Sequence, residues 1–452
     1  MSTISTLETM QSNELDLAGI GVGPFNLSLA AVLSHIPNLK TAFFERSVDF
    51  TWHPGLMIQN SILQSSFLKD LVTPVMPTSP HSFLNYLVSH KRFYDFTSGR
   101  FGSVTRQEFS NYLSWVAMRL QSVQFKSNVR EVRFENGVFH LDFDNAETIK
   151  AQNLSLGTGM RPYLPECSKP HIGESCFHAS EYLFRAPDLS GKRVVIIGGG
   201  QTGAEIFLQA LTNANMAPSH VTWVNRRNSF SPLEEGAFVD QIFTPNYVKA
   251  YQSFSDTLKD QEYKGQKLAS DGLTPSTVAD IYSELYRRTH LSEEHNTFSM
   301  RPGCELIDMS KDLQGYRLTL ESQSMEQNAE LDVDVVILAT GAKPFVPECM
   351  NPIADRFDRI KGGGLALDDH YRVQWDDSKT NTIYALNHGA QSHGIVDAQL
   401  SLMAWRSATI ANDIIGRDMF DVDPGMCLVD WQGLPASVMH ERADLIMTDR
   451  AS

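Results

Sequence analysis

Short apolar runs recur along the chain, and the clearest of them end in glycine. Residues 15–20, 194–197 and 335–338 are almost entirely apolar, as strands buried on both faces of a sheet are. The first two runs lead into a glycine turn and then into a helix-forming stretch. This strand–turn–helix order predicts an α/β fold built around parallel sheets.

Other segments show a different periodicity. Apolar and polar residues alternate in VREVRFENGVFHLDF (129–143) and in YRLTLES (316–322), which predicts antiparallel hairpin strands. The stretch 269–288 has the spacing of a helix, with Thr274 as its N-cap and Pro275 at the first helical position.

The first glycine turn, GVGPFN, lies at residues 21–26. Gly21 and Gly23 occupy the first two positions of a dinucleotide-binding turn, but Asn26 stands where a third glycine normally packs the helix against the strand. The asparagine predicts a slightly more open turn, with its amide near a bound pyrophosphate. The next strand ends at Glu45, about where an acidic residue binds ribose hydroxyls.

The second glycine turn has all three glycines, in the spacing G-x-G-x-x-G. Gly198, Gly200 and Gly203 lie between a strand-like run and a helix, which predicts a pyrophosphate site at a helix N-terminus. The strand that follows leads into Arg226 and Arg227 rather than an acid. A basic pair suits a ribose 2′-phosphate and therefore predicts NADPH rather than NADH; the alternative is that the two arginines belong to a solvated loop.

Two turns of this kind in one chain predict two nucleotides, FAD and NADPH. The five cysteines are scattered and form no C-x-x-C pair, which argues against a disulfide reductase and against a zinc site. We expect no metal. Electrons delivered to the flavin need another acceptor, and oxygen is the obvious one, so a monooxygenase or an oxidase is expected.

The order of the two turns predicts an inserted domain. The apolar run at 335–338 leads into another glycine turn, at Gly341. A glycine there indicates that the backbone comes close to a ligand, here FAD, or to neighbouring backbone. We interpret that run as the point at which the chain returns to the first domain. The predicted layout is then a mobile N-terminal tail (1–14), the first part of an FAD-binding domain (15–190), an NADPH-binding domain (191–330), the second part of the FAD domain with the substrate site (331–415) and a C-terminal extension (416–452).

Charge and hydropathy exclude other classes. The net charge is −15 and no block of five or more Lys or Arg occurs, which argues against nucleic acid as a partner. No apolar run approaches the roughly 20 residues that span a bilayer. The polar N-terminal residues lack the apolar core of a signal peptide, so a cytoplasmic protein without a transmembrane segment is expected.

Several motifs together resemble the microbial N-hydroxylating monooxygenases of siderophore biosynthesis. The resemblance covers about residues 14–415 and is strongest to the lysine N6-hydroxylase branch, whose relatives act on ornithine, diamines or histamine. The family's FAD turn is G-x-G-P-x-N, which accounts for Asn26. The motifs are GIGVGPFNLSLA, WHPGLM, LQSSFLKDLVTPVMPTSPHSFLNYL, GGGQTGAE, SDGLTPSTVADIYSELY, VVILATGAKP and HGIVDAQLSLMAWRSA.

The resemblance implies a reaction. NADPH would reduce FAD, and oxygen would add to the reduced flavin to give a flavin hydroperoxide. A neutral primary amine, L-lysine first and a diamine or histamine as alternatives, would then attack this hydroperoxide and become a hydroxylamine. It also implies a homo-oligomer. Two other readings are a Baeyer–Villiger or sulfur-oxidising flavin monooxygenase and a catalytically idle flavoprotein sensor; the two intact turns argue against the sensor.

The resemblance also assigns site residues. Trp52, His53 and Gln64 would line the flavin. Lys69 would contact the carboxylate of an amino-acid substrate, and Asp240 and Ser270 fall near positions that hold the substrate backbone. Asp271 falls there too, and the ornithine enzymes have asparagines at these positions, which makes ornithine less expected. Asp397 would either bind an amine or cap the helix that follows it.

Overall fold

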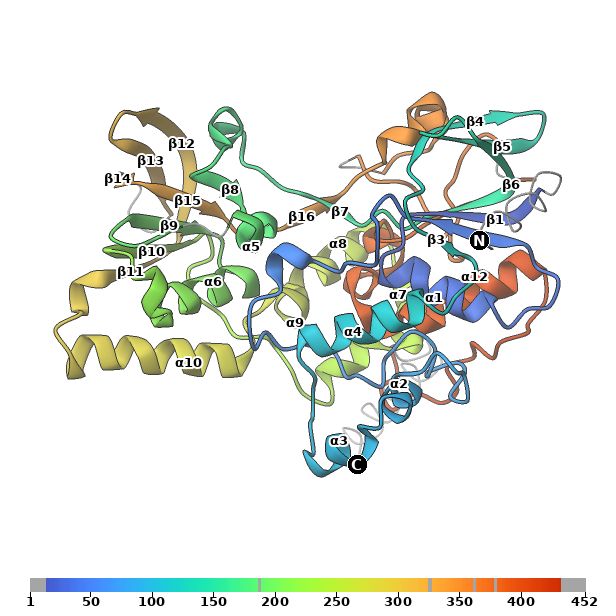
Figure 1. The fold of residues 1–452 in the computed structure, drawn as a ribbon, viewed down its shortest axis with the longest axis horizontal. Coiled ribbons are helices and arrows are strands. Elements are labelled where there is room, and N and C mark those ends of the chain that lie inside the picture. Colours follow the sequence, from blue (N-terminus) through green and yellow to red (C-terminus); the bar gives the residue numbers. More distant parts are fainter. Residues whose placement is uncertain (1–13, 186–187, 324–326, 361–362, 378–379, 432–452) are drawn as a thin grey trace, which may run out of the picture.

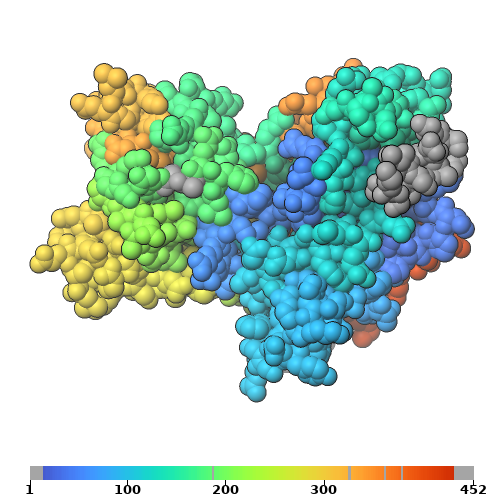
Figure 2. All heavy atoms as spheres, viewed as in Figure 1, coloured from blue at the N-terminus to red at the C-terminus, as the bar shows by residue number. Residues whose placement is uncertain are grey.

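The computed structural model describes residues 14–185, 188–323, 327–360, 363–377 and 380–431, so the predicted N-terminal tail up to residue 13 and the last 21 positions of the C-terminal extension lie outside it. The chain forms two lobes (Figure 1). The space-filling view shows a notch between them (Figure 2). Within the described ranges, no helix is long and apolar enough to cross a membrane.

The first lobe is built around a seven-stranded sheet in the order β3-β2-β1-β6-β5-β4, with β17 beside β6. Its central strands are parallel and buried on both faces: Leu17 of β1 packs with the helices, whereas Ala18 belongs to a separate core on the other face. The elements are β1 (Leu15–Ile20), α1 (Pro24–Leu33), β2 (Thr41–Phe44), α2 (Phe83–Ser89), α3 (Phe93–Ser98), α4 (Arg106–Ala117), β3 (Val123–Gln124), β4 (Val129–Glu135), β5 (Val138–Phe143), β6 (Thr148–Leu156), β17 (Ile383–Ala385), α11 (Ala390–His393) and α12 (Met403–Ile415).

The second lobe has a five-stranded parallel sheet in the order β11-β10-β9-β15-β8. Helices α6 and α10 cover one face, and an antiparallel three-stranded sheet, β12-β13-β14, packs on the other. The elements are β8 (Cys176–His178), α5 (Tyr182–Arg185), β9 (Arg193–Ile197), α6 (Gln201–Thr212), β10 (His220–Asn225), α10 (Pro275–Tyr286), β11 (Phe298–Pro302), β12 (Cys304–Asp312), β13 (Gly315–Ser322), β14 (Gln327–Val333) and β15 (Val335–Leu338). The predicted α/β fold with two dinucleotide-binding sheets is confirmed.

One predicted strand placement is wrong. The run at 335–338 was expected to return to the first sheet at the 330/331 boundary, but β15 lies between β9 and β8 of the second sheet. The chain crosses between the lobes instead at β7 (Met160–Pro162) and β16 (Ala342–Pro344), which pair antiparallel (Figure 1). We call residues 14–162 and 342–431 the first unit and residues 163–341 the second unit.

Part of the second unit packs on the first. Helices α7 (Pro245–Ser253), α8 (Asp256–Gly265) and α9 (Lys267–Asp271) lie near α11 and the turn that follows it. Val248 of α7 is fully buried in the same core as α1 and α12. The segment just before α7 and the end of α9 therefore lie at the boundary between the two units.

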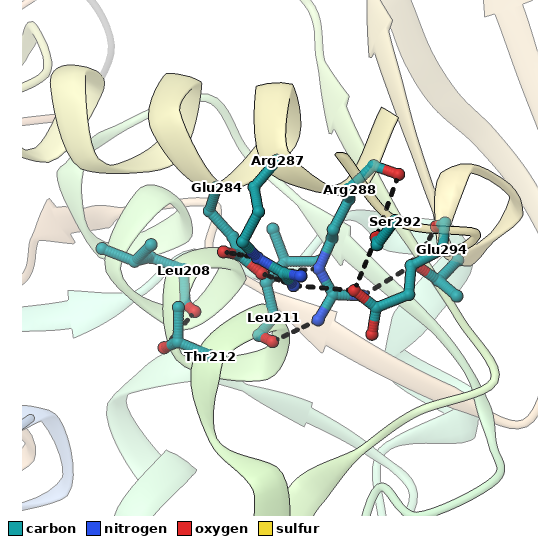
Figure 3. Close-up of polar contacts among 9 residues, drawn as sticks. Leu208, Leu211, Thr212, Glu284, Arg287, Arg288, Ser292 and Glu294 are labelled. Carbon is teal, nitrogen blue, oxygen red and sulfur yellow. Dashed lines mark hydrogen bonds and ion pairs between the residues drawn. The ribbon is translucent and has the colours of Figure 1, made fainter. Parts of the chain in front are cut away.

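The remaining local predictions are largely confirmed. Segments 129–143 and 316–322 form antiparallel strands. The helix predicted at 269–288 is divided, because α9 ends at Asp271 and α10 begins at Pro275 after Thr274. At the far end of α10, Arg288 donates to the Leu211 carbonyl at the end of α6 and pairs with Glu284 (Figure 3), which fixes α10 on α6.

The histidine that precedes α2 predicts an acid-sensitive first unit. His81 is 9% exposed, and burial, followed by the charges of His35 and Arg119, lowers its pKa to about 4. The unfolded chain therefore takes up a proton below about pH 6.5 that the folded protein resists until about pH 4. We expect acidification from pH 7 to pH 5 to cost about 2 kcal/mol of stability through this one group.

Thermal unfolding of the wild type and of His81→Gln, followed from pH 7 to pH 5, measures this contribution. The midpoint should fall less in the variant. Equal falls in both proteins would contradict the assignment.

Candidate cofactor and substrate site

The first glycine turn joins β1 to α1 and closes against the backbone after β6. Gly21 has φ +81°, and a Cβ there would lie 2.9 Å from the Gly157 carbonyl oxygen, so only glycine suits this position. Gly23 is the N-cap of α1, and no side chain caps that helix. The orphan N–H groups of the first helical turn are thus available to an anion, as a pyrophosphate site requires.

Asn26 is fully buried and holds this turn together. Its Nδ2 donates to the carbonyl of Gly21 at 2.7 Å, and its Oδ1 accepts from the Ser155 hydroxyl of β6 at 2.6 Å. The Asn26 amide is thus occupied within the protein, and its expected nearness to a bound pyrophosphate stays a prediction. The asparagine fills the space that the missing glycine would leave and ties the turn to β6.

Glu45 lies at the end of β2, beside the same turn. One carboxylate oxygen accepts from the Val22 N–H at 3.0 Å and the other from the Ser47 N–H at 2.9 Å. Each oxygen keeps a second lone pair, which could accept from a ribose hydroxyl. The position and chemistry of this side chain fit the predicted ribose contact.

The second glycine turn joins β9 to α6, and its glycines have different tasks. A Cβ on Gly198 would lie 2.0 Å from the Ala339 oxygen, and one on Gly203 would lie 2.2 Å from the Gly198 oxygen, so these two allow close packing. Gly200, the uncapped N-cap of α6, would place a Cβ in open space. The opening in front of this helix N-terminus fits a second pyrophosphate.

Arg226 and Arg227 follow β10 at the edge of the second turn. The Arg226 side chain is 71% exposed and pairs with Glu305 at 3.3 Å. Arg227 is 40% exposed; it donates to the Asp271 carbonyl at 3.3 Å and lies 3.8 Å from the Asp271 carboxylate. Both guanidinium groups therefore keep donors that are free to meet a phosphate.

A cavity of about 240 Å³ lies where the two units meet. Trp52 and His53 line it from the first unit, and Trp52 also packs edge-on against Phe109 at 5.9 Å. Thr202, in the first turn of α6, lines it from the second unit. The other lining residues are Leu56, Met57 and Arg106. Thr202 thus brings the first turn of α6, which follows the second glycine turn, to this cavity.

Two further residues predicted to meet FAD lie near the boundary between the units. Gln64 donates to the Thr274 hydroxyl at 3.0 Å. Gly341 directly precedes β16, and its carbonyl accepts from His178 Nε2 at 3.0 Å and from the Tyr163 N–H at 2.9 Å. Whether these residues contact FAD stays a prediction.

Lys69 of the first unit and Asp240 of the second unit lie near enough for their charges to interact. Lys69 is partly buried, which lowers the pKa of its ammonium, while the negative charge of Asp240 raises it. Asp240 is exposed, in the short helical segment that precedes α7. The next residue, Asp70, is buried and accepts from the N–H groups of Val72, Thr73 and Phe83, which fixes the loop that carries Lys69.

The last two predicted substrate residues have partners within the protein. The Ser270 hydroxyl donates to the neighbouring Asp271 carboxylate at 2.8 Å. Asp397 is 2% exposed; it accepts from the Gly389 N–H at 2.8 Å and lies 3.4 Å from the buried Arg406 guanidinium. Its predicted capping role is wrong, because α12 begins after Leu402 and has no side-chain cap.

Sequence reasoning missed Arg106 and Glu205, which form an ion pair across the unit boundary. Glu205 is the last residue of GGGQTGAE and is a charged residue in a mainly apolar helical segment. Its own side chain is only 7% exposed. A charge at such a position indicates a buried partner, but only the fold shows that the partner is 99 residues away.

Comparisons with known proteins extend over nearly the whole chain. The model of the family described as L-lysine 6-monooxygenase/L-ornithine 5-monooxygenase matches residues 13–344. The chain is 39% identical to L-lysine N6-monooxygenase of Escherichia coli, over 92% of this chain and 98% of that protein.

Solved structures agree with this match. The cadaverine monooxygenase DfoA of the Erwinia amylovora desferrioxamine pathway, bound to FAD, superposes with a TM-score of 0.87 at 26% identity and covers 94% of this chain and 99% of its own. The Kutzneria sp. 744 ornithine N-hydroxylase KtzI, with reduced FAD, NADP⁺ and L-ornithine, has a TM-score of 0.82 at 28% identity, over 89% and 99%.

Proposed function

Because the chain belongs to the L-lysine 6-monooxygenase/L-ornithine 5-monooxygenase family, we propose that it hydroxylates the side-chain amine of L-lysine, using FAD and NADPH. In this reaction one oxygen atom of O₂ goes to the amine and the other to water, and NADPH supplies the two electrons. The product, N6-hydroxylysine, would enter siderophore biosynthesis. We further propose that the enzyme is a cytoplasmic homo-oligomer.

The observation that carries the proposal is the pair of uncapped, glycine-lined helix N-termini, one in each unit. Gly23 begins α1 beside Glu45, which suits FAD, and Gly200 begins α6 beside the Arg226–Arg227 pair, which suits NADPH. FAD, when bound, supplies oxygen activation, and NADPH supplies reducing equivalents. The protein's own residues bind these groups, orient them toward the cavity and limit the access of water.

The substrate assignment rests on Lys69 and Asp240. An ammonium that is partly withdrawn from water needs an anionic partner, and the α-carboxylate of an amino acid would supply one. Asp240 would then pair with the α-ammonium of the same molecule. The reacting side-chain amine must be neutral, and its transfer out of bulk water would favour that form.

A product assay across a small panel of amines tests the proposal. The purified protein with FAD and NADPH is given L-lysine, L-ornithine, cadaverine, putrescine or histamine, and hydroxylamine formed is compared with NADPH consumed. We expect hydroxylamine from L-lysine at the highest ratio. No hydroxylamine from any amine, despite oxidation of NADPH, would refute the N-hydroxylase function.

A diamine is the second candidate, and Asp240 favours it. An exposed carboxylate beside the site could bind the second ammonium of cadaverine or putrescine without help from Lys69. The match to a cadaverine monooxygenase supports the same alternative. Product from a diamine but not from L-lysine would replace the lysine assignment and leave the N-hydroxylation chemistry in place.

The cofactor preference gives a separate prediction. Replacing both Arg226 and Arg227 by alanine should weaken NADPH binding by about 10-fold to 150-fold, because each charge-assisted contact to a phosphate contributes about 1.5–3 kcal/mol. The lower end is expected, since both side chains are well exposed.

Titration of NADPH and of NADH against the wild type and the double variant measures the effect. NADH binding should change little, because NADH lacks the 2′-phosphate. Unchanged NADPH affinity would show that the two arginines belong to a solvated loop.

A further inference from the structure

A buried ion pair joins the two units beside the shared cavity. Arg106 Nη1 lies 3.0 Å from Glu205 Oε2, and Arg106 Nη2 lies 3.0 Å from Glu205 Oε1, so the contact is bidentate. The two side chains are 19% and 7% exposed. A pair with this geometry fixes direction as well as distance.

The first unit holds Arg106 rigidly. Its backbone N–H donates to the Ser61 carbonyl at 2.8 Å, and the Leu63 N–H donates to the Val104 carbonyl at 2.9 Å. These bonds pair segment 61–63 with segment 104–106, at the start of α4. They place Gln64 and Arg106 at the same edge of the first unit.

The second unit meets this edge with one side of α6. Gln201 and Glu205 are one helical turn apart, and Gln201 Nε2 donates both to Glu205 Oε1 at 2.9 Å and to the Thr277 hydroxyl at 3.0 Å. Gln201 Oε1 accepts from the Thr274 N–H at 2.8 Å, and the Thr274 hydroxyl accepts from Gln64. The bonds therefore run from the first unit through α6 and α10 and back to the first unit.

We propose that Glu205, acting through Arg106, is the positioning residue that sets the relation between the two glycine turns. Glu205 lies on the helix that begins at Gly200, and Arg106 lines the cavity together with Thr202 of that helix. The inference rests on the proposed function, since its consequence is the alignment of the nicotinamide with the flavin. A misplacement of about 1 Å at reacting groups can cost about 100-fold in rate.

Three variants and one matched control test the role. Glu205→Gln and Arg106→Gln each remove one charge, and the double variant removes both and leaves no unpaired charge at the boundary. The control is Glu284→Gln. It breaks the pairs of Glu284 with Arg288 and Arg287, of which the Arg288 pair is similarly buried, but both lie entirely inside the second unit (Figure 3).

Anaerobic reduction of the bound flavin by NADPH is the first readout. We expect Glu205→Gln to slow it by about 10-fold to 100-fold, with FAD content unchanged. The double variant should be no slower than the slower single variant, because the two residues act as one unit. Glu284→Gln should stay within about 2-fold of the wild type, because the pairs that it breaks lie away from the boundary between the units.

Hydrogen exchange of the protein without NADPH is the second readout. Glu205→Gln and the double variant should exchange faster in peptides that cover 60–64 and 272–278, whereas Glu284→Gln should do so only around 208–214 and 284–297. If Glu205→Gln does not fold, the double variant carries the test.

Wild-type flavin reduction in Glu205→Gln, or an equal slowing in Glu284→Gln, would overturn the positioning role. Both results come from flavin reduction by NADPH and therefore do not depend on which amine is the substrate. A wild type that reduces its flavin but forms no hydroxylamine refutes the proposed function alone.

Discussion

Replacing Gly200 by alanine is expected to weaken NADPH binding by about 100-fold and to leave FAD binding unchanged; replacing Gly23 by alanine is expected to do the reverse. Both residues have ordinary negative φ values, of −92° and −81°. A Cβ on Gly200 would meet nothing within 4 Å, and one on Gly23 would come no closer than 3.6 Å to the Gly157 oxygen. The folded protein itself therefore tolerates either methyl group.

The methyl group would instead occupy the space in front of an uncapped helix N-terminus. Overpacking there costs about 1–3 kcal/mol, and the charge-assisted N–H contacts that a displaced pyrophosphate loses cost about 1.5–3 kcal/mol more for each bond. The lower ends of the two costs together correspond to about 100-fold. The two variants separate the sites because the turns belong to different units.

Equilibrium titration of each nucleotide against both variants measures the effect, with bound FAD followed by its visible absorption. Gly265→Ala is the control, since that glycine ends α8 and a Cβ there would also meet nothing within 4 Å. A folded Gly23→Ala variant that retains full FAD affinity would remove the first turn from the FAD site. Loss of both nucleotides in both variants would indicate general unfolding.

Lys69→Ala should lower kcat/KM for L-lysine by at least about 30-fold and leave flavin reduction by NADPH nearly unchanged. Removing one partner of a desolvated charge pair costs about 2–5 kcal/mol, because the remaining carboxylate is left without its cation. The loss should appear mainly as a raised KM. More of the NADPH consumed should then yield hydrogen peroxide instead of hydroxylamine.

Steady-state kinetics with L-lysine and with cadaverine distinguish the two candidate substrates. Cadaverine has no carboxylate, so Lys69→Ala should not impair its turnover and could improve it by removing a like charge. The exposed Lys150 supplies a control, Lys150→Ala, that should match the wild type. Equal losses with both amines would mean that Lys69 does not bind the substrate carboxylate.

The parts of the molecule that could be predicted are those specified by neighbouring residues. The glycine spacings at 21–26 and 198–203 place a strand, a turn and a helix within one short segment, and both appear as predicted. Pro275 likewise specifies the start of α10 locally. Its ring favours the first helical turn, and the backbone N–H that proline lacks would have no intrahelical partner there.

The parts that could not be predicted depend on partners far along the chain. The run at 335–338 is buried on both faces, and such a run fits the centre of either parallel sheet equally well. From the sequence, Asp397 could be assigned only as an amine-binding residue or as a helix cap. Its partner is Arg406, and the sequence spacing does not reveal this pair; only the burial of both side chains in the fold does. Asn26 was placed in the correct turn, but its amide points inward because Ser155 of β6 lies beneath it.

The pairing of β17 with β6 also sets an order of events during synthesis. Asn153 and Thr382, which bond at this junction, are 229 residues apart. At about 5–20 residues per second, a ribosome needs roughly 10–50 s to reach the second partner. During that interval the carboxyl end of β6 lacks the neighbour that covers Leu154 and Leu156 in the finished protein. A nascent chain stalled anywhere in the second unit would thus present an open, apolar strand edge, which is the kind of surface that chaperones recognise and that aggregation begins from.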